Sequence, residues 1–290
     1  MRKVLLFVCL LMAGMTVNVN AAKQKAKHVI LIGMDGWGAY SVPKADIPAI
    51  KSLMTNGCYT LHSRSVLPSS SAINWASMFM GVGTELHGYT TWGSKTPEIP
   101  SREVNERGIA PTIFSVLREQ RPKAEIGCLY EWPGIKYLVD TLAMSYQYQT
   151  PGYAKAPTAL CEAAEKYIIE KKPELLAICF EEPDHTGHTK GHDTPAYYQM
   201  LKELDGYVER ILQAIKKAGI WDDTIIIMTA DHGGIETGHG GKTLREMEIP
   251  FIISGKNVRK GMEIKERIKV GTEMINPKII TAVSTTKWRN

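Results

Sequence analysis

The stretch TIIIMTADHGG, residues 224–234, decides the fold, because an apolar β-forming run there ends abruptly at an acid, a histidine and two glycines. Residues 224–229 are apolar almost throughout, which predicts a strand covered on both faces, as in the parallel sheet of an α/β layer structure. Ligand sites form at the carboxyl ends of such strands. Asp231 and His232 would offer an oxygen and a nitrogen to such a site, although an ordinary turn is the simpler explanation of the pair taken alone.

Two further apolar runs end in the same way. Residues 29–32 in HVILIGMDGWG are followed by Asp35, and residues 175–180 in ELLAICFEEPDHTGHTKGHD are followed by Asp184 and His188. A purely structural sheet has no need to repeat acids and histidines at the ends of three strands. The repetition therefore predicts a metal site at one edge of the sheet, in preference to three unrelated turns.

The ligand types indicate which metal to expect. Carboxylates mixed with imidazoles favour Zn²⁺ or a related divalent ion over Mg²⁺ or Ca²⁺, which would have been indicated by oxygen ligands alone. The candidates are too many for one tetrahedral ion. Two ions ~3.5–4 Å apart clamp a phosphoryl group and stabilise both the entering and the leaving oxygen. The sequence thus predicts two divalent metal ions as cofactors, with Zn²⁺ as the expected metal.

A candidate nucleophile lies in VLPSSSAINWASMFMG, residues 66–81, where three serines follow Pro68 just ahead of a predicted helix over 72–80. A serine at a helix N-terminus faces free backbone N–H groups and the positive end of the helix dipole. It can therefore hold an anion and be deprotonated by a metal. The alternative is that these serines only cap the helix, which is the commoner role of serine at that place.

Composition and the N-terminus set the expected class and compartment. The chain has 290 residues, 44% hydrophobic and 22% charged, and its net charge of +5 is too small to indicate a nucleic-acid polymer as partner. Arg2 and Lys3 precede an apolar run that ends in a Val-Asn-Ala step at Ala21, the plan of a secretory signal. We therefore expect a signal peptide over 1–21 and a periplasmic or secreted chain over 22–290, folded as one domain without a stable membrane span.

Other notable side chains have structural explanations. The cysteines after the signal show no C-x-x-C spacing, so a disulfide is permitted but not indicated; they are Cys58, Cys128, Cys161 and Cys179. Trp37, Trp75 and Trp92 are expected to pack in the core, with a wall for the substrate as the alternative. The histidines outside the predicted ligand positions are expected to pack or to orient the ligands, and they include His87, His185 and His192.

Together these segments resemble the alkaline phosphatase superfamily, and within it the type I phosphodiesterase and nucleotide pyrophosphatase branch. The resemblance runs from the first strand to about Gly255 and rests on the order and spacing of MDGWG, PSSSAINWASMFMGVGTELHGY, EEPDHTGH, TADHGG and GHGGKTLREMEIPFIISG. It implies an α/β fold with a doubly wound, mostly parallel central sheet and helices on both faces.

The resemblance also implies a role for each residue at a matching position. One ion would be held by Asp35, Ser71, Asp231 and His232, and the other by Asp184, His188 and His239. Ser71 would be the nucleophile, in preference to Ser69 and Ser70, because of its distance to the following helix and to Gly81. Asn74 would help to hold a phosphoryl oxygen, as in the diesterase branch.

The function implied is an exported, metal-dependent hydrolase that cleaves phosphodiester or pyrophosphate bonds in small molecules, nucleotides included, through a serine nucleophile. His239 follows the Asp-His pair sooner than in nucleotide pyrophosphatases, which is nearer to the phosphate-transferring mutases of the superfamily. A phosphomonoesterase is an alternative, although no residue is identified that would bind its extra charge. A sulfatase is disfavoured because Ser71 lacks the C-x-P-S-R context, and a non-catalytic metal- or phosphate-binding protein would have no use for Ser71.

Overall fold

The computed structural model describes residues 25–151 and 156–265. The predicted signal peptide over residues 1–21 lies outside these ranges, and so does the C-terminal stretch 275–290. Within the described ranges, no helix combines the length and the apolar character that crossing a membrane requires.

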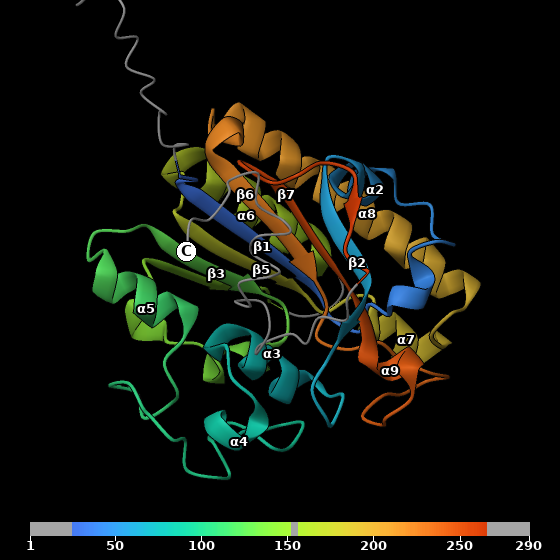
Figure 1. Ribbon diagram of the computed structural model, residues 1–290, viewed down its shortest axis with the longest axis horizontal. Helices are drawn as coiled ribbons and strands as arrows, with labels where there is room; N and C mark the ends of the chain where they lie inside the picture. Colours follow the sequence, from blue (N-terminus) through green and yellow to red (C-terminus); the bar gives the residue numbers. More distant parts are fainter. Residues whose placement is uncertain (1–24, 152–155, 266–290) are drawn as a thin grey trace, which may run out of the picture.

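A single eight-stranded sheet forms the centre of the described chain, in the order β4-β3-β5-β1-β6-β7-β2-β8 (Figure 1). The strands are β1 (His28–Met34), β2 (Gly57–Arg64), β3 (Ile126–Tyr130), β4 (Tyr146–Gln149), β5 (Leu175–Phe180), β6 (Thr224–Thr229), β7 (Glu248–Gly255) and β8 (Met262–Glu263). Each pair of neighbouring strands in the part β4-β3-β5-β1-β6 is parallel, and β7 is antiparallel to both β6 and β2. The mostly parallel sheet predicted from the resemblance is therefore confirmed.

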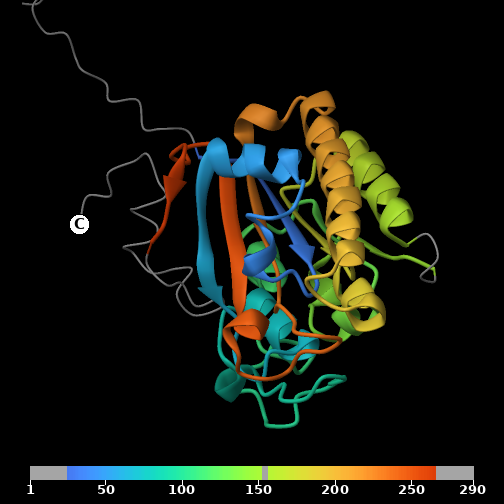
Figure 2. The same ribbon diagram turned by 90° about the vertical axis from the view of Figure 1, so that its right-hand side faces the viewer.

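Helices cover both faces of this sheet. One face carries α2 (Pro48–Thr55), α6 (Ala156–Lys171) and α8 (Pro195–Lys217), which pack side by side (Figure 2). The remaining helices are α3 (Ser71–Met80), α4 (Thr84–His87), α5 (Ile113–Gln120), α7 (Asp184–Lys190) and α9 (Leu244–Met247). Short 3₁₀ turns lie at η1 (Ala39–Ser41), η2 (Pro133–Tyr137), η3 (Thr141–Ala143) and η4 (Trp221–Asp223).

The packing of α3 on the other face fixes its distance from the central strand. The ring of Trp75 occupies the place where a side chain would stand at Gly33 of β1, since a Cβ added there would lie 2.2 Å from the ring. Trp75 stacks on Phe79, which in turn meets Phe114 of α5. A glycine in the middle of β1 therefore lets α3 approach the sheet closely.

The element boundaries agree closely with the sequence where an apolar run is long. Strands β5 and β6 span the predicted residues 175–180 and 224–229, and β1 extends the predicted 29–32 by one residue before and two after. The helix predicted over 72–80 begins one residue earlier, at Ser71. Buried strands of this kind are recognisable because nearly every position is apolar. All four cysteines of the described ranges are buried, and no disulfide joins them.

Candidate active site

The predicted ligands converge at the carboxyl ends of three neighbouring strands. Asp35 follows β1, Asp184 opens α7 after β5, and Asp231 follows β6. Because β1 lies between β5 and β6 in the sheet, the three segments meet. The backbone joins them further: the Asp184 N–H donates to the carbonyl of Asp35, and the Gly36 N–H donates to Asp231 Oδ1 at 3.1 Å.

One group of possible metal ligands consists of Asp35, Asp231 and His232, whose ligand atoms lie within 4.8 Å of one another. His232 Nε2 is 3.3 Å from Asp35 Oδ1 and 3.3 Å from Asp231 Oδ2. Ser71 Oγ lies 3.2 Å from the same nitrogen. The structure thus brings together the four residues that the resemblance assigns to one ion.

A second group consists of Asp184, His232 and His239, again within 4.8 Å. His188 Nε2 lies 3.0 Å from Asp184 Oδ2, and the rings of His188 and His239 are 5.0 Å apart. The expected trio of Asp184, His188 and His239 is therefore assembled. The rings of His232 and His239 stack at 3.7 Å, so that His232 stands between the two groups. The family resemblance assigned His232 to one ion only.

The three imidazoles share an arrangement that suits metal ligands. The Nδ1 atom of His188 is 2.8 Å from the carbonyl of Thr237, and that of His232 is 2.8 Å from the carbonyl of Gly233. His239 Nδ1 is likewise 2.9 Å from the Ser69 carbonyl. A carbonyl can only accept, so each Nδ1 carries a proton, and each Nε2 is the nitrogen left to bind a metal once it is deprotonated.

The carboxylates are too close together to be stable as bare charges. Burial raises the pKa of Asp35 well above its ordinary value, and the charges of Asp231 and Asp184 add to this effect. Burial and the charge of Asp184 raise the pKa of Asp231 to about 7. Burial would raise the pKa of Asp184 too, but the His188 hydrogen bond and the charges of His232 and His239 outweigh it and lower that pKa to about 2.

Buried oxygens without a hydrogen-bond donor mark where a cation would bind. Within the described ranges, Asp35 Oδ1, Asp184 Oδ1 and Asp231 Oδ2 are buried and have no hydrogen-bond partner. Such oxygens are costly unless a positive charge faces them. Three orphaned carboxylate oxygens beside three imidazoles with available Nε2 atoms fit divalent ions that accept both oxygen and nitrogen ligands.

The three serines before α3 have different surroundings. Ser69 Oγ donates to the carbonyl of Gly241 and accepts from the Gly240 N–H. Ser70 is the N-cap residue of α3, yet its side chain makes no capping hydrogen bond. Ser71 is the first residue of the helix, and its hydroxyl faces His232. Its position therefore fits the predicted nucleophile, and it does not cap the helix.

The structure places Asn74 differently from the prediction. Its Oδ1 accepts from the Val66 N–H at 2.7 Å, and its Nδ2 lies within donor range of the carbonyls of Val66, Pro68 and Ser70. An amide has two donor hydrogens, so these contacts occupy it. The predicted contact with a phosphoryl oxygen is thus replaced by a structural one, in which Asn74 holds the loop that delivers the serines.

Two positioning residues were not recognised in the sequence. Trp75 Nε1 donates to Asp35 Oδ2 at 3.0 Å and so orients a predicted ligand. The Glu246 carboxylate accepts from the Gly241 and Thr243 N–H groups and from the Thr243 hydroxyl, and it thereby closes the loop that carries His239. The Thr-x-x-Glu spacing at 243–246 is a capping-box pattern that could have been found from the sequence. Nothing in the sequence indicated the partner of Trp75.

The other histidines and tryptophans divide between core and surface. His87 Nε2 contacts the Ser77 hydroxyl, away from the ligands, whereas His192 is buried with its Nε2 3.6 Å from Asp184 Oδ1. Trp37 is buried as expected. Trp92 is not: it is 60% exposed and lies 6.4 Å, between ring centroids, from Trp132, which follows β3 at the same edge of the sheet.

Once any bound metal has been removed by a chelator, the chain should show a free energy of unfolding that falls as pH rises from about 6.5 to 9. Burial raises the pKa of Glu131 to about 8, and its bond to Asp184 raises the pKa of His188 to about 9. A group whose pKa is raised in the folded state stabilises the fold at low pH, and this contribution is lost as pH rises to the raised value. For buried Glu131 the loss between pH 6.5 and 8 is roughly 2 kcal/mol. Histidines with lowered pKa values, such as His192, oppose this trend near pH 6.5, where the unfolded imidazole is half protonated, and contribute no slope at the upper end of the range.

Urea unfolding with chelator and with saturating Zn²⁺, at both ends of this pH range, measures the effect. Zinc should restore stability most at the higher pH, because metal binding favours the deprotonated ligands. A chelated chain that becomes more stable as pH rises would contradict the electrostatic description of the site.

Comparisons with known proteins agree with this geometry. A family model described as type I phosphodiesterase / nucleotide pyrophosphatase matches residues 29–275. A protein of Mus musculus named bis(5'-adenosyl)-triphosphatase enpp4 is 24% identical over 226 residues, which cover 74% of this chain and 48% of that protein. Venom phosphodiesterase 2 of Crotalus adamanteus is 25% identical over 227 residues, covering 71% and 26%. The chain spans about half the length of the first relative and about a quarter of the second.

Solved structures share the fold at low identity. An inactive variant of murine ectonucleotide pyrophosphatase / phosphodiesterase 5, in complex with AMP, superimposes with a TM-score of 0.69 at 16% identity, covering 92% of this chain and 97% of that one. A 2-O GAG sulfatase superimposes with a TM-score of 0.67 at 14% identity, covering 90% and 72%. These likenesses establish the alkaline phosphatase-like fold alone.

Proposed function

Because the chain belongs to the type I phosphodiesterase / nucleotide pyrophosphatase family of the alkaline phosphatase superfamily, we propose that it is a metal-dependent hydrolase of phosphodiester or pyrophosphate bonds with Ser71 as nucleophile. One observation carries the proposal. The Ser71 hydroxyl lies 3.2 Å from an imidazole nitrogen that itself contacts two buried carboxylates. A binding protein would have no use for a hydroxyl there.

The proposed cofactors are two divalent ions, with Zn²⁺ as the preferred metal. Asp35, Ser71, Asp231 and His232 would hold one ion, and Asp184, His188 and His239 the other; His232 is close enough to both groups to orient the pair. When bound, such ions lower the pKa of an alcohol or water and neutralise charge on a phosphoryl group. The three carbonyl-bound Nδ1 atoms keep the Nε2 atoms ready for this role.

In the proposed reaction, Ser71 Oγ forms a bond to phosphorus while the bond to the leaving oxygen breaks on the opposite side. The proton of Ser71 leaves and the departing oxygen takes up a proton, so that a phosphoseryl or nucleotidyl-serine ester forms. Water then attacks its phosphorus, the bond to Ser71 Oγ breaks, and Ser71 regains a proton as the phosphate product leaves. The chain contributes the position of the hydroxyl, which α3 fixes, and the N-terminus of that helix, whose free N–H groups attract the phosphoryl charge. Asn74 contributes by holding the loop before Ser71.

Nucleotides are the proposed substrate class. The relatives named bis(5'-adenosyl)-triphosphatase and the structural neighbour bound to AMP support this choice. Trp92 is exposed and lies against the partly buried Trp132, and the ring of Trp92 offers a surface on which a base would stack. The preference for diesters over monoesters no longer rests on Asn74, because its amide makes hydrogen bonds to the backbone of its own loop. Export is proposed from the N-terminal segment 1–21, and a single catalytic domain is proposed over 22–290.

A substrate panel on zinc-loaded protein tests the proposal. We expect p-nitrophenyl esters of nucleoside 5'-monophosphates to be hydrolysed with the highest kcat/KM, ahead of bis(p-nitrophenyl) phosphate, p-nitrophenyl phosphate and p-nitrophenyl sulfate. Faster cleavage of the monoester or of the sulfate would replace the proposal with a phosphomonoesterase or a sulfatase. Metal binding without turnover of any ester would indicate the non-catalytic alternative.

A further inference from the structure

The outer strand β4 presents an open edge of the sheet. Within the described ranges it pairs with β3 only. Its four residues, Tyr-Gln-Tyr-Gln, contain no charge and no proline, which are the usual protections of an exposed edge. The Thr150 N–H donates inward to the Tyr130 carbonyl, so the alternation of a strand points the N–H and C=O groups of Gln147 and Gln149 outward.

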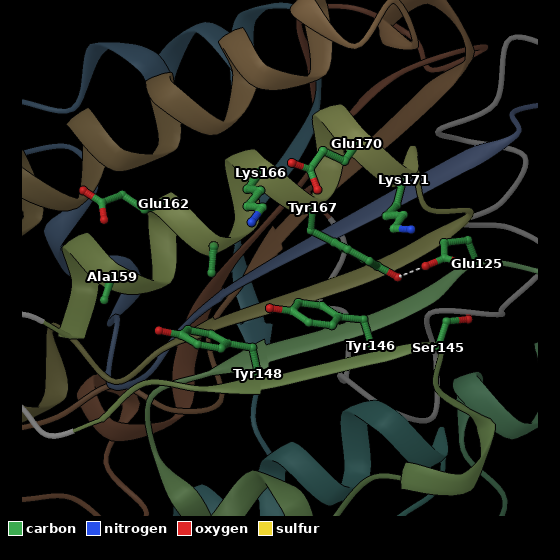
Figure 3. Close-up of a pocket in the computed structure, with 11 residues that line it drawn as sticks. Glu125, Ser145, Tyr146, Tyr148, Ala159, Glu162, Lys166, Tyr167, Glu170 and Lys171 are labelled. Atoms are coloured by element: carbon green, nitrogen blue, oxygen red, sulfur yellow. Dashed lines mark hydrogen bonds between the residues drawn. The ribbon is translucent and has the colours of Figure 1, made fainter.

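A cavity of about 660 Å³ lies beside this edge, between β4 and α6. Figure 3 shows Tyr146 and Tyr148 side by side along the strand, with Lys166 of α6 extending toward them. Ala159 and Ala163 on α6 leave room where larger side chains would fill the space. The cavity is therefore apolar where it meets the strand and charged along the exposed side of the helix.

The edge is held in place rather than loosely attached. Arg118 of α5 donates to the Ala143 carbonyl and to the Ser145 hydroxyl, directly before β4. Leu142, in the turn η3 before the strand, is nevertheless 68% exposed. A fixed open edge with an exposed leucine next to it is typical of a surface that another protein covers.

We propose that the partner at this edge is a second copy of the chain, paired antiparallel through β4 about a twofold axis at Gln147. In that register the outward N–H and C=O groups of Gln147 exchange hydrogen bonds with those of the partner's Gln147, and Tyr146 stands opposite the partner's Tyr148. Residues directly opposite each other in antiparallel strands share a face. The partner's tyrosine would therefore enter the cavity beside α6, and the reciprocal contact would fill the partner's cavity.

The charges on α6 match such an axis. The ring centroids of Tyr146 and Tyr167 lie 4.7 Å apart, so these two residues stand at the same height along β4 and α6. The helix runs in the direction opposite to the strand (Figure 3). One strand residue, ~3.3 Å, equals about two helix residues, so an axis at Gln147 crosses α6 near residue 165. Glu162 and Lys166 are both exposed on the cavity side, and the midpoint between them on α6 lies close to residue 165, where the axis would cross. Each would face the opposite charge of the partner, a self-complementary pattern that a free peptide would not require.

Sedimentation equilibrium of the purified chain tests the proposal. We expect a dimer whose dissociation constant rises roughly tenfold or more in Glu162→Lys and in Lys166→Glu, because each places like charges across the axis twice. An equimolar mixture of these two variants should recover the affinity, since the mixed dimer again joins opposite charges. Gln147→Pro, which removes an outward N–H, should also weaken the dimer.

Glu203→Lys on the exposed side of α8 is the matched control and should leave the dimer unchanged. Thermal melts of each variant separate a loss of folding from a loss of association. A wild-type chain that stays monomeric would overturn the proposal and leave the edge to a different partner. So would a dimer that the charge variants weaken no more than the control, or a mixture that fails to recover affinity.

Discussion

Ser71→Ala is expected to remove nearly all hydrolysis while the chain still folds and binds metal. The change removes the proposed attacking oxygen and its proposed contact to metal, but it leaves the aspartates and histidines of both groups in place. Removing the catalytic serine of a protease costs about 10⁶-fold in kcat, and a water activated by metal could replace part of the loss here. We therefore expect a decrease of several orders of magnitude in kcat, measured on the best substrate of the panel.

Ser70→Ala is the control for this experiment. Ser70 precedes α3, and its side chain makes no capping hydrogen bond, so its loss should lower kcat far less. Metal content per folded chain should be close to wild type in both variants. Near-native turnover in Ser71→Ala, or a larger loss in Ser70→Ala, would show that another serine carries the reaction.

His232→Ala is expected to release both ions, because its ring lies within reach of both groups of ligands. Residues that only orient a metal ligand already cost about 10–100-fold in metal affinity when they are changed, so the loss of a ligand between two sites should exceed that range. His239→Ala should release mainly one ion, since it contacts the Asp184 group. Metal analysis after gel filtration, together with kcat on the same samples, measures both effects.

His87→Ala provides a buried histidine for comparison, because its ring contacts Ser77 and the Tyr89 N–H away from the ligands. It should lower stability without changing the metal content of the folded fraction. If His232→Ala retained two ions per chain, the two-ion arrangement proposed around this ring would be wrong.

The sequence by itself determined the strands and the kind of side chain at their ends. An apolar run such as 224–229 is recognisable because a strand covered on both faces needs apolar residues at nearly every position. Parallel neighbours bring their carboxyl ends to one edge, so Asp35, Asp184 and Asp231 could be expected to meet before any coordinates were known. The order of the motifs then indicated the family, which the match over residues 29–275 confirms.

Only the tertiary structure decided how those side chains are held. Asn74 faces the carbonyls of its own loop, Trp75 donates to Asp35, and His232 stands between two groups of ligands. Each arrangement depends on which hydrogen-bond partner lies within about 3 Å in the folded chain, and several partners compete for the same donor. The open edge at β4 likewise became visible only with the strand order, because a short polar strand carries no signal of its neighbours. Local pattern specifies which groups a segment carries, whereas long-range packing selects the partners they meet.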